Sequence, residues 1–412
     1  MTITEMGARA KEAARVLATA GALKEAALLH AAHALWSRRE EILAANAQDL
    51  EAGKAAGLSQ ALLDRLALTE GRIQDMKTAV EEVAKAADPV GRILSGETRP
   101  NGLRIEKVTV PLGVIGIIYE ARPNVTSDAA ALCLKAGNVV ILRGGKEAIH
   151  SNKAVAGVLR DALEEAGLPA DCVQLVEDTS RQSAQELMGL TQYLDVLIPR
   201  GGAGLIRSVK ENARVPVIET GVGNCHVYVD ASADLDMAAE IIYNAKCSRP
   251  SVCNAIETIL VHQDVAKAAL PKIKARLDEK QVELRGCDRA RAILPGITPA
   301  VEEDWATEYL DYILAVKVVD SLEEALGHIA RYSTGHSECI VTQDYTAAQR
   351  FLNEVDAAAV YVNASTRFTD GGQFGLGAEI GISTQKLHAR GPMGLEQLVS
   401  YKFLIRGSGQ VR

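Results

Sequence analysis

The chain has little of what marks several large classes of protein. Aromatic residues make up 4% of its 412 residues, and the formal net charge is -8. A nucleic-acid-binding protein usually carries a basic face, so this balance argues against one. The longest apolar run, residues 110–119, is broken by Pro111, Gly113 and Gly116 and is too short to cross a bilayer. No basic segment followed by an apolar one opens the chain, so we expect a cytoplasmic protein without membrane association.

Paired cysteines and clustered histidines are also missing. The seven cysteines are scattered and form no CxxC pair, so they indicate neither a disulfide framework nor a zinc site. No two of the eight histidines show the i, i+4 spacing of a metal site. We therefore expect no metal, and the remaining possibility is one reactive thiol among six inert ones.

The apolar residues, 48% of the chain, follow helical and strand periods that predict an α/β protein of two or three domains. Residues 1 to about 95 have helical spacing, and residues 103–110 alternate as in an exposed strand or hairpin. Farther on, short apolar strands alternate with helices, as in a parallel sheet covered on both faces. The expected strands are residues 113–119, 139–142, 173–176, 196–198, 217–218, 255–261, 312–319 and 358–362. The expected helices are residues 127–136, 148–166, 264–279, 321–331 and 344–355.

Cys253 is the candidate nucleophile. It follows a proline-containing loop, residues 249–252, and precedes Asn254, a setting that can place a thiol beside free backbone N–H groups. Such groups lower the pKa of a thiol and can later hold an oxyanion, and Lys246 and Arg249 would act in the same direction. A small buried hydrophobe is the commoner role for a cysteine taken at random.

Two loops after expected strands suit phosphate groups. Parallel sheets bind ligands at the carboxyl ends of their strands, and glycines with cations there allow close backbone approach and supply charge. The first loop contains Arg143, Gly144, Gly145 and Lys146, and the second contains Arg200, Gly201 and Gly202. A solvated basic turn explains either loop alone equally well. Two such loops in one sheet favour phosphate binding more than either loop does by itself.

Polar residues at other strand ends are further candidates for the active site. Glu219 follows the expected strand at residues 217–218 and suits a general base or a salt-bridged side chain. Asn124 follows residues 113–119 and can donate a side-chain N–H to an oxyanion. Residues 336–338 and 371–381 are expected to be loops that line a pocket.

Read in order, these segments resemble the aldehyde dehydrogenase superfamily, and within it the branch that reduces gamma-glutamyl phosphate in proline synthesis. The resemblance covers essentially the whole chain. It rests on Tyr119-Glu-Ala-Arg-Pro-Asn124, Val139-Val-Ile-Leu-Arg143, Glu219-Thr-Gly-Val-Gly223, Arg249-Pro-Ser-Val-Cys253-Asn254 and the run from Val319 to Ile340.

The resemblance implies an aldehyde-dehydrogenase-like α/β fold with three parts. A Rossmann-type NADP-binding domain would comprise residues 1–95 and 111–222, and an α/β catalytic domain residues 223–390. A small β oligomerisation element would comprise residues 96–110 and 391–412, so a homo-oligomer is expected.

The resemblance also implies roles for single residues. Cys253 matches the nucleophile, and Asn124 with the Cys253 N–H matches the oxyanion hole. Glu308 matches the glutamate at the nicotinamide ribose, and Glu219 matches the acid that activates water in hydrolytic members. Arg143 stands where many members have a lysine at the adenosine ribose.

The implied cofactor is NADPH, because Arg143 and Lys146 could hold its extra phosphate. Two loops depart from the superfamily pattern. Residues 199–204 replace the usual Thr-Gly-Ser, and Gly-Val-Gly-Asn follows Glu219 in place of a Gly-Gly-Lys pattern. Because of the second departure, the role of Glu219 is the one that the resemblance supports least.

The implied reaction converts L-glutamate 5-phosphate into the 5-semialdehyde through a cysteine thioester, with a possible association with glutamate 5-kinase. Loop placement suggests five residues as contacts for this acyl phosphate: Arg122, Asn224, His226, Ser251 and His336. Two alternatives remain, an aldehyde dehydrogenase that forms a free acid and a silent protein that only partners the kinase.

Overall fold

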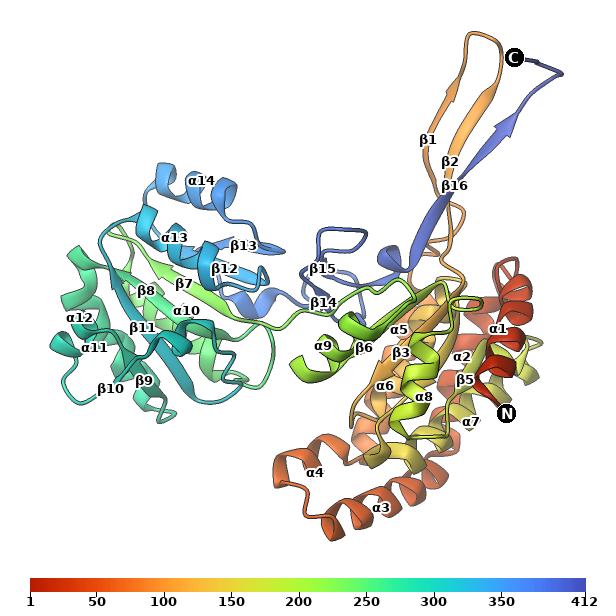
Figure 1. The fold of residues 1–412 in the computed structure, drawn as a ribbon, viewed down its shortest axis with the longest axis horizontal. Coiled ribbons are helices and arrows are strands. Elements are labelled where there is room, and N and C mark those ends of the chain that lie inside the picture. The colour runs from red at the N-terminus through yellow and green to blue at the C-terminus, as the bar shows by residue number, and fades with distance from the viewer. The chain divides into compact units, whose positions relative to one another are not determined.

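A computed structural model describes the whole chain except the side chain of residue 61. The chain forms two compact units (Figure 1). The first comprises Met1–Thr220, Gly375–Gly381 and Met393–Arg412, and the second comprises Gly221–Phe374 and Ile382–Pro392.

The first unit is built around a parallel sheet of four strands in the order β5-β4-β3-β6. The strands are β3 (Val114–Tyr119), β4 (Val139–Arg143), β5 (Val173–Leu175) and β6 (Val196–Arg200). All six residues of β3 are buried, as expected for a strand with apolar residues on both faces. The chain passes from β3 to β4 and β5 on one side and returns to the other side of β3 for β6. The point where strand order reverses, at which such sheets bind ligands, therefore lies between β3 and β6.

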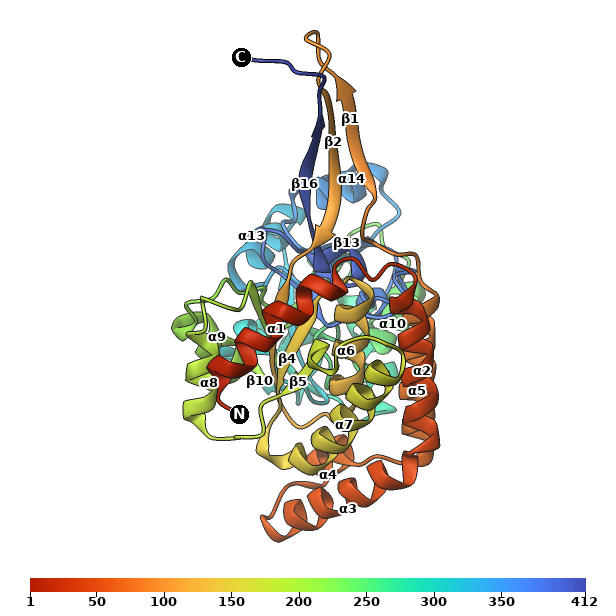
Figure 2. The ribbon, with the colours of Figure 1, turned by 90° about the vertical axis from the view of Figure 1, so that its right-hand side faces the viewer.

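Within the part of the chain that the structure describes, nine α-helices belong to this unit. They are α1 (Ile3–Leu17), α2 (Leu23–Ser37), α3 (Arg39–Ala55), α4 (Gln60–Leu66), α5 (Glu70–Lys85), α6 (Asn124–Lys135), α7 (Ile149–Glu165), α8 (Arg181–Met188) and α9 (Ala203–Asn212). Helix α2 packs against α5 and α7 (Figure 2), and Thr2 and Glu5 form a capping box that starts α1. The helical region predicted to reach about residue 95 ends at Lys85. The helix predicted from residue 127 begins three residues earlier, at Asn124.

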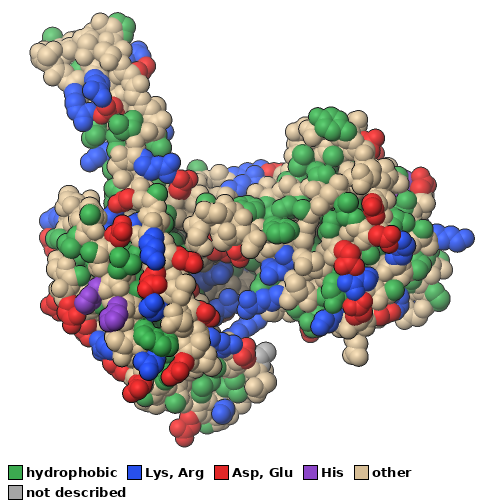
Figure 3. Space-filling model, turned by 180° about the vertical axis from the view of Figure 1, so that it is seen from behind, with side chains coloured by type: hydrophobic (Ala, Val, Ile, Leu, Met, Phe, Trp, Pro, Cys, Tyr) green, Lys and Arg blue, Asp and Glu red, His purple; other side chains and the backbone are tan. Residues whose placement is uncertain are grey.

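A three-stranded antiparallel sheet, here called the arm, belongs to the first unit. Its strands are β1 (Ile93–Thr98), β2 (Arg104–Pro111) and β16 (Val399–Arg406), in the order β1-β2-β16. Every residue of β1 is exposed, and both hydrophobic and basic side chains show on the arm in Figure 3. The predicted hairpin is present, paired with a strand from the far end of the chain.

The second unit contains a seven-stranded parallel sheet in the order β10-β9-β11-β8-β7-β12-β13. Its strands are β7 (Cys225–Val229), β8 (Ile256–His262), β9 (Glu283–Gly286), β10 (Thr298–Pro299), β11 (Ile313–Val319), β12 (Ser337–Val341) and β13 (Ala359–Val362). Its helices are α10 (Leu235–Cys247), α11 (Gln263–Asp278), α12 (Asp288–Ile293), α13 (Leu322–Tyr332) and α14 (Tyr345–Glu354). A short ladder joins β14 (Ile382–Ser383) and β15 (Gly391–Pro392).

Alternation along the central strands fills a core on each face of this sheet. Val227 and Ile259 pack with residues of α10, α11 and α12, whereas Tyr228 and Leu260 pack with residues of α13 and α14. Successive side chains of a strand point to opposite faces, so both faces are buried.

Two expectations about the elements were wrong, and several elements were missed. Residues 217–218 form only one bridge, between Leu197 and Val217, and Glu219 therefore follows no full strand. Residues 336–338 are not a loop, because Ser337 starts the buried strand β12. Strands β7, β9 and β12 were missed, as were the helices at residues 181–188, 203–212, 235–247 and 288–293. Among the residues described, no helix is both long and apolar enough to cross a membrane.

Candidate active site

In the first unit, polar backbone groups gather at the carboxyl ends of β3 and β6. Helix α9 starts there with Gly202 as its N-cap, and no side chain caps it. The N–H of Gly202 donates to the carboxylate of Glu120 at 3.0 Å. Uncapped N–H groups at a helix start attract anions, and the carboxylate shows that this loop can hold one. Arg200 ends β6 half-buried beside the exposed Gly201.

Two cations follow β4. The Arg143 Nη2 donates to the carbonyl oxygens of Thr179 (2.6 Å) and Ser180 (2.9 Å), and its Nε has no partner. Burial lowers the Arg143 pKa, an effect that Asp178 and Glu147 oppose. Gly144 and Gly145 are buried and Lys146 is exposed. Neither cation forms an ion pair with any described residue, so both charges remain available to a ligand.

Asn124 is exposed at the first position of α6, and its side-chain N–H donates to Asp128 at 2.8 Å. Burial raises the pKa of Asp128 to about 6, although the hydrogen bonds from Asn124 and Ser127 act to lower it. Asp128 thus orients the amide. Arg122 is half-buried, and Glu219, also half-buried, forms an ion pair with Lys210 at 3.0 Å.

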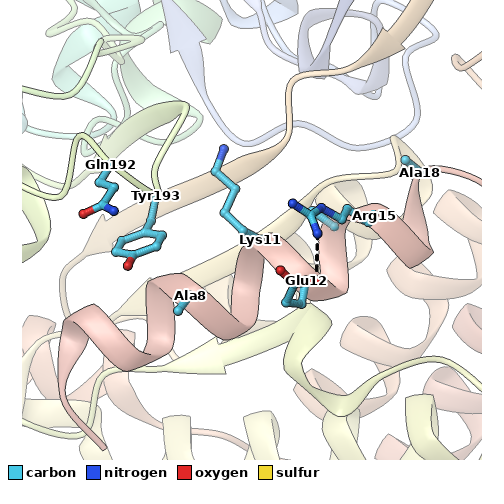
Figure 4. Close-up of a pocket in the computed structure, with 8 residues that line it drawn as sticks. Ala8, Lys11, Glu12, Arg15, Ala18, Gln192 and Tyr193 are labelled. Atoms are coloured by element: carbon cyan, nitrogen blue, oxygen red, sulfur yellow. Dashed lines mark hydrogen bonds and ion pairs between the residues drawn. The ribbon is translucent and has the colours of Figure 1, made fainter.

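A separate groove of about 530 Å³ lies between α1 and residues 192–193 (Figure 4). Its charged side chains are paired, Lys11 with Asp195 at 2.7 Å and Arg15 with Glu12 at 3.1 Å. We assign no chemistry to this groove.

In the second unit, Cys253 lies on a turn between α10 and β8, residues 248–255, here called the nucleophile loop. It is half-buried, as is Cys287, whereas the other five cysteines are buried. Burial raises the pKa of the thiols of Cys172 and Cys339 to about 12 and that of Cys247 to about 11. A thiolate is the reactive form, so these buried thiols are inert near neutral pH.

The backbone of Cys253 is packed directly against the start of β7. A Cβ added at Gly223 would lie 1.5 Å from the Cys253 carbonyl oxygen, so only glycine fits there. The Cys225 thiol donates to the same oxygen at 3.2 Å. Gly223 also donates its N–H to the Glu308 carboxylate at 2.7 Å, and burial raises the pKa of Glu308. One glycine therefore positions both the Cys253 backbone and the Glu308 carboxylate.

Arg367 and Asn254 fix the ends of the nucleophile loop. The Arg367 Nε donates to Ser248 Oγ at 3.0 Å, and its Nη1 donates to Asn254 Oδ1. Asn254 donates in turn to the Thr369 carbonyl at 2.9 Å. Nothing in the local sequence around Arg367 predicts this contact.

Lys246 does not face the thiol as expected. It is fully buried and paired with Glu257 at 2.6 Å. Burial lowers the pKa of Lys246 and raises that of Glu257 to about 7. The pair joins the end of α10 to the start of β8 and so brackets the nucleophile loop.

The five suggested substrate contacts separate into two groups. Arg122 and Ser251 are half-buried, whereas Asn224, His226 and His336 are fully buried in the second unit. Asn224 donates to the carbonyls of Trp305 and Tyr332, both at 2.8 Å. The N–H of His226 donates to Glu338 at 2.9 Å, and burial lowers the His336 pKa to about 4. All three side chains are enclosed in the second unit and expose no polar atom to solvent.

The candidate residues of the second unit lie before strands, not after them. Gly223 precedes β7, Cys253 precedes β8, Glu308 precedes β11 and His336 precedes β12. Since the strands are parallel, their amino ends meet at one edge of the sheet. The cationic loops of the first unit lie at the carboxyl ends of its strands, and the candidate residues of the second unit lie at the amino ends.

A parallel sheet with cationic loops at its switch point suits a dinucleotide, and an accessible thiol on a fixed turn suits covalent catalysis. The class so defined is a nicotinamide-dependent oxidoreductase that works through a cysteine. The chain belongs to the aldehyde dehydrogenase family, whose model matches residues 2–303.

Within that family, the chain is similar over its full length to proteins of one name. A gamma-glutamyl phosphate reductase of Moorella thermoacetica is 64% identical over 413 residues, covering 100% of this chain and 99% of the relative. The solved structure of the reductase of the same name from Thermotoga maritima has a TM-score of 0.97 and 52% identity, covering 99% of each chain. That from Saccharomyces cerevisiae has a TM-score of 0.56 and 31% identity, covering 100% of this chain and 99% of the other.

Proposed function

We propose that this protein reduces L-glutamate 5-phosphate to L-glutamate 5-semialdehyde with release of phosphate, using NADPH, as a step of proline biosynthesis. Its full-length relatives, up to 64% identical among those compared, carry the name of that activity. The observation that carries the proposal is the half-buried Cys253, whose backbone is held against Gly223 on a fixed turn.

The covalent step follows from this geometry. The Cys253 sulfur attacks the acyl carbon, a C–S bond forms, and the bond to the phosphate oxygen breaks, so that phosphate leaves with the electron pair. The backbone N–H of Cys253 and the Asn124 amide, oriented by Asp128, are the proposed oxyanion donors. Loss of one such donor typically reduces the rate by ~10²–10³.

The first unit suits the cofactor. Its α9 start is uncapped and Arg143 keeps an unpartnered Nε. We assign the extra phosphate of NADP to Arg143 and Lys146, with backbone approach at Gly144 and Gly145. The pyrophosphate is assigned to Arg200, Gly201 and Gly202.

In the second unit, Glu308, fixed by Gly223, is assigned to the nicotinamide ribose. When bound, the reduced nicotinamide supplies a hydride to the thioester carbon. The resulting thiohemiacetal releases the aldehyde, and the sulfur takes up a proton.

Three parts carry these roles in the proposal. Residues 1–95 and 111–222 bind the cofactor, and residues 223–390 hold the nucleophile. Residues 96–110 and 391–412 join copies of the chain, because the arm exposes unpaired edge strands. A cytoplasmic location and transfer of the acyl phosphate from glutamate 5-kinase complete the proposal.

The reverse reaction tests the function. NADPH formation from NADP and glutamate 5-semialdehyde is measured with and without inorganic phosphate, and we expect turnover only with phosphate. Equal turnover without phosphate would identify a hydrolytic aldehyde dehydrogenase in which Glu219 activates water. No turnover, with no alkylation of Cys253 by iodoacetamide, would identify a silent binding protein.

Replacement of the nucleophile tests the covalent step. We expect Cys253→Ser to lose at least about 10³-fold in kcat, since a serine hydroxyl without an adjacent base is a weak nucleophile. Cys287→Ser is the matched control, because Cys287 is the other half-buried cysteine. Near-native turnover of Cys253→Ser would contradict the mechanism.

A further inference from the structure

We propose that Arg367 and Arg249 bind the phosphate group of the acyl phosphate, and this inference rests on the proposed function. Neither residue was identified as a phosphate ligand from the sequence. Arg249 lies in the nucleophile loop, and Arg367 reaches that loop from the short 3-10 helix at Thr366–Phe368.

These two arginines differ from the others of the second unit. That unit contains nine arginines, of which seven form ion pairs with carboxylates and two, Arg249 and Arg367, form none with any residue described. The seven are Arg276, Arg285, Arg289, Arg291, Arg331, Arg350 and Arg390. Two guanidinium charges thus remain without a protein counter-ion, both at the nucleophile loop.

The contacts of Arg367 fix its position without neutralising its charge. Its side-chain partners are the hydroxyl of Ser248 and the amide oxygen of Asn254, both uncharged. The carboxylate of Asp370, which lies in the same segment, accepts N–H groups of Gly372 (2.9 Å) and Gln373 (3.3 Å) instead. A half-buried guanidinium that is held in place but not paired is prepared for an anion that arrives with the substrate.

The charges around Arg367 indicate where that anion binds. Burial and the nearby Arg249 lower the Arg367 pKa, while Asp370 and Cys253 raise it. Arg249 and Cys253 therefore both lie within electrostatic range of Arg367. Two like charges within range of each other repel, and an anion bound near both relieves that repulsion. The group that approaches together with the carbon attacked by Cys253 is the phosphate.

This arrangement suits the chemistry of the step in both directions. When the C–O bond breaks, its electron pair moves to the phosphate oxygen, and the added negative charge develops beside two cations. In reverse, a phosphate oxygen attacks the thioester carbon, the C–S bond breaks, and the sulfur leaves as thiolate. Charge-assisted hydrogen bonds are the strong ones, so the two arginines would lower the barrier each way.

Steady-state kinetics of the reverse reaction, with inorganic phosphate as the varied substrate, test the site. We expect Arg249→Ala and Arg367→Lys to raise the KM for phosphate by about 10- to 100-fold, the range for one charged hydrogen bond. The KM for NADP should change less than twofold. Arg249 is exposed and its side chain contributes none of the hydrogen bonds described for the nucleophile loop. Arg249→Ala therefore keeps the loop contacts of Arg367 and guards against a folding defect. Arg350→Gln, an ion-paired arginine on α14, is the control expected to behave as native.

Protection of the thiol gives a readout that needs no turnover. Inorganic phosphate should slow the alkylation of Cys253 by iodoacetamide in the native protein and in Arg350→Gln, but not in Arg249→Ala. A native KM for phosphate and native protection in both site variants would overturn the inference and leave the proposed function standing. Turnover of the native protein without phosphate would instead overturn the proposed function, and this inference with it.

Discussion

At the scale of single residues, Gly223 shows how closely the nucleophile is held. We expect Gly223→Ala to reduce kcat by about 100-fold or more, because the new methyl group would displace the Cys253 carbonyl, and a 1 Å displacement of a reacting group can cost about 10²-fold. The measurement is kcat, with circular dichroism to verify folding. Gly327→Ala is the matched control, because a Cβ on that residue of α13 meets nothing within 4 Å. Native kcat in Gly223→Ala would contradict the packing described.

His336 makes the stability of the second unit depend on pH. Its folded pKa of about 4 lies below the ordinary value of 6.5, so the unfolded chain binds more protons between these two pH values. The stabilisation is complete above pH 6.5 and is lost as the pH falls towards 4. At about 1.4 kcal/mol per pKa unit, it amounts to about 3 kcal/mol.

Urea unfolding at pH 7 and pH 4.5 measures this effect. We expect His336→Gln to lose less stability between the two pH values than the native protein, whereas His30→Gln, at an exposed position, should match the native protein. Equal losses in native and His336→Gln would show that other groups, such as His328 with its pKa lowered to about 3, dominate the acid response.

Some of the candidate site could be predicted from the sequence, and some could not. Cys253 and the loops after β4 and β6 have local signals, because each lies next to an apolar strand or a run of glycines. Gly223 and Arg367 have none, since their roles come from contacts with a loop distant in the sequence. His336 was predicted as a pocket residue, but neighbouring strands bury it.

At the scale of elements, the buried Lys246–Glu257 pair holds α10 to β8. We expect Glu257→Ala to lower the free energy of unfolding by about 3–5 kcal/mol, because it leaves a buried ammonium without a partner. Lys246→Met combined with Glu257→Leu should recover much of that loss. Lys274→Ala, which removes a more exposed ion pair with Asp278, should cost at most about 1 kcal/mol.

Chemical denaturation of these variants gives the unfolding free energies. A double variant no more stable than Glu257→Ala would indicate that the pair has a role beyond mutual neutralisation. Iodoacetamide rates on Cys253 in the same variants would then show whether the nucleophile loop has moved.

The elements themselves were predicted best where both faces are apolar. Strands β3 and β4 were placed to within one residue at each end, because Val114–Tyr119 and Val139–Arg143 are nearly continuous apolar runs. Strands β7 and β12 were missed because they begin with polar residues, Cys225-His226 and Ser337-Glu338. The backbone N–H and the ring Nδ1 of His226 both contact the Glu338 carboxylate, and only the paired strands reveal these contacts.

At the scale of the whole molecule, the two units use opposite edges of their sheets. The first unit has its cationic loops at the carboxyl ends of β4 and β6, the neighbours of β3. The second places Cys253 and Glu308 at the amino ends of β8 and β11. The expectation that candidate residues lie at the carboxyl ends of strands therefore fits the loops of the first unit and not Cys253 or Glu308.

The arm should decide the oligomeric state. Tyr401, Phe403 and Ile405 alternate along β16 on one face and are between 51% and 60% exposed, and β16 has one unpaired edge. Exposed apolar residues on an edge strand are unfavourable in a monomer, and pairing with a second copy would bury both the apolar row and the unpaired edge.

We expect the native protein to sediment as an oligomer at micromolar concentration. The double variant Phe403→Ser with Ile405→Ser should sediment as a monomer that keeps its helical circular dichroism. Lys402→Ser, on the other face of β16, should leave the oligomer intact, because its change affects charge and not the apolar row. A native monomer would mean that the apolar row of β16 is covered by a different partner, and an oligomeric double variant would place the contact on β1, where Ile93 and Leu94 are exposed.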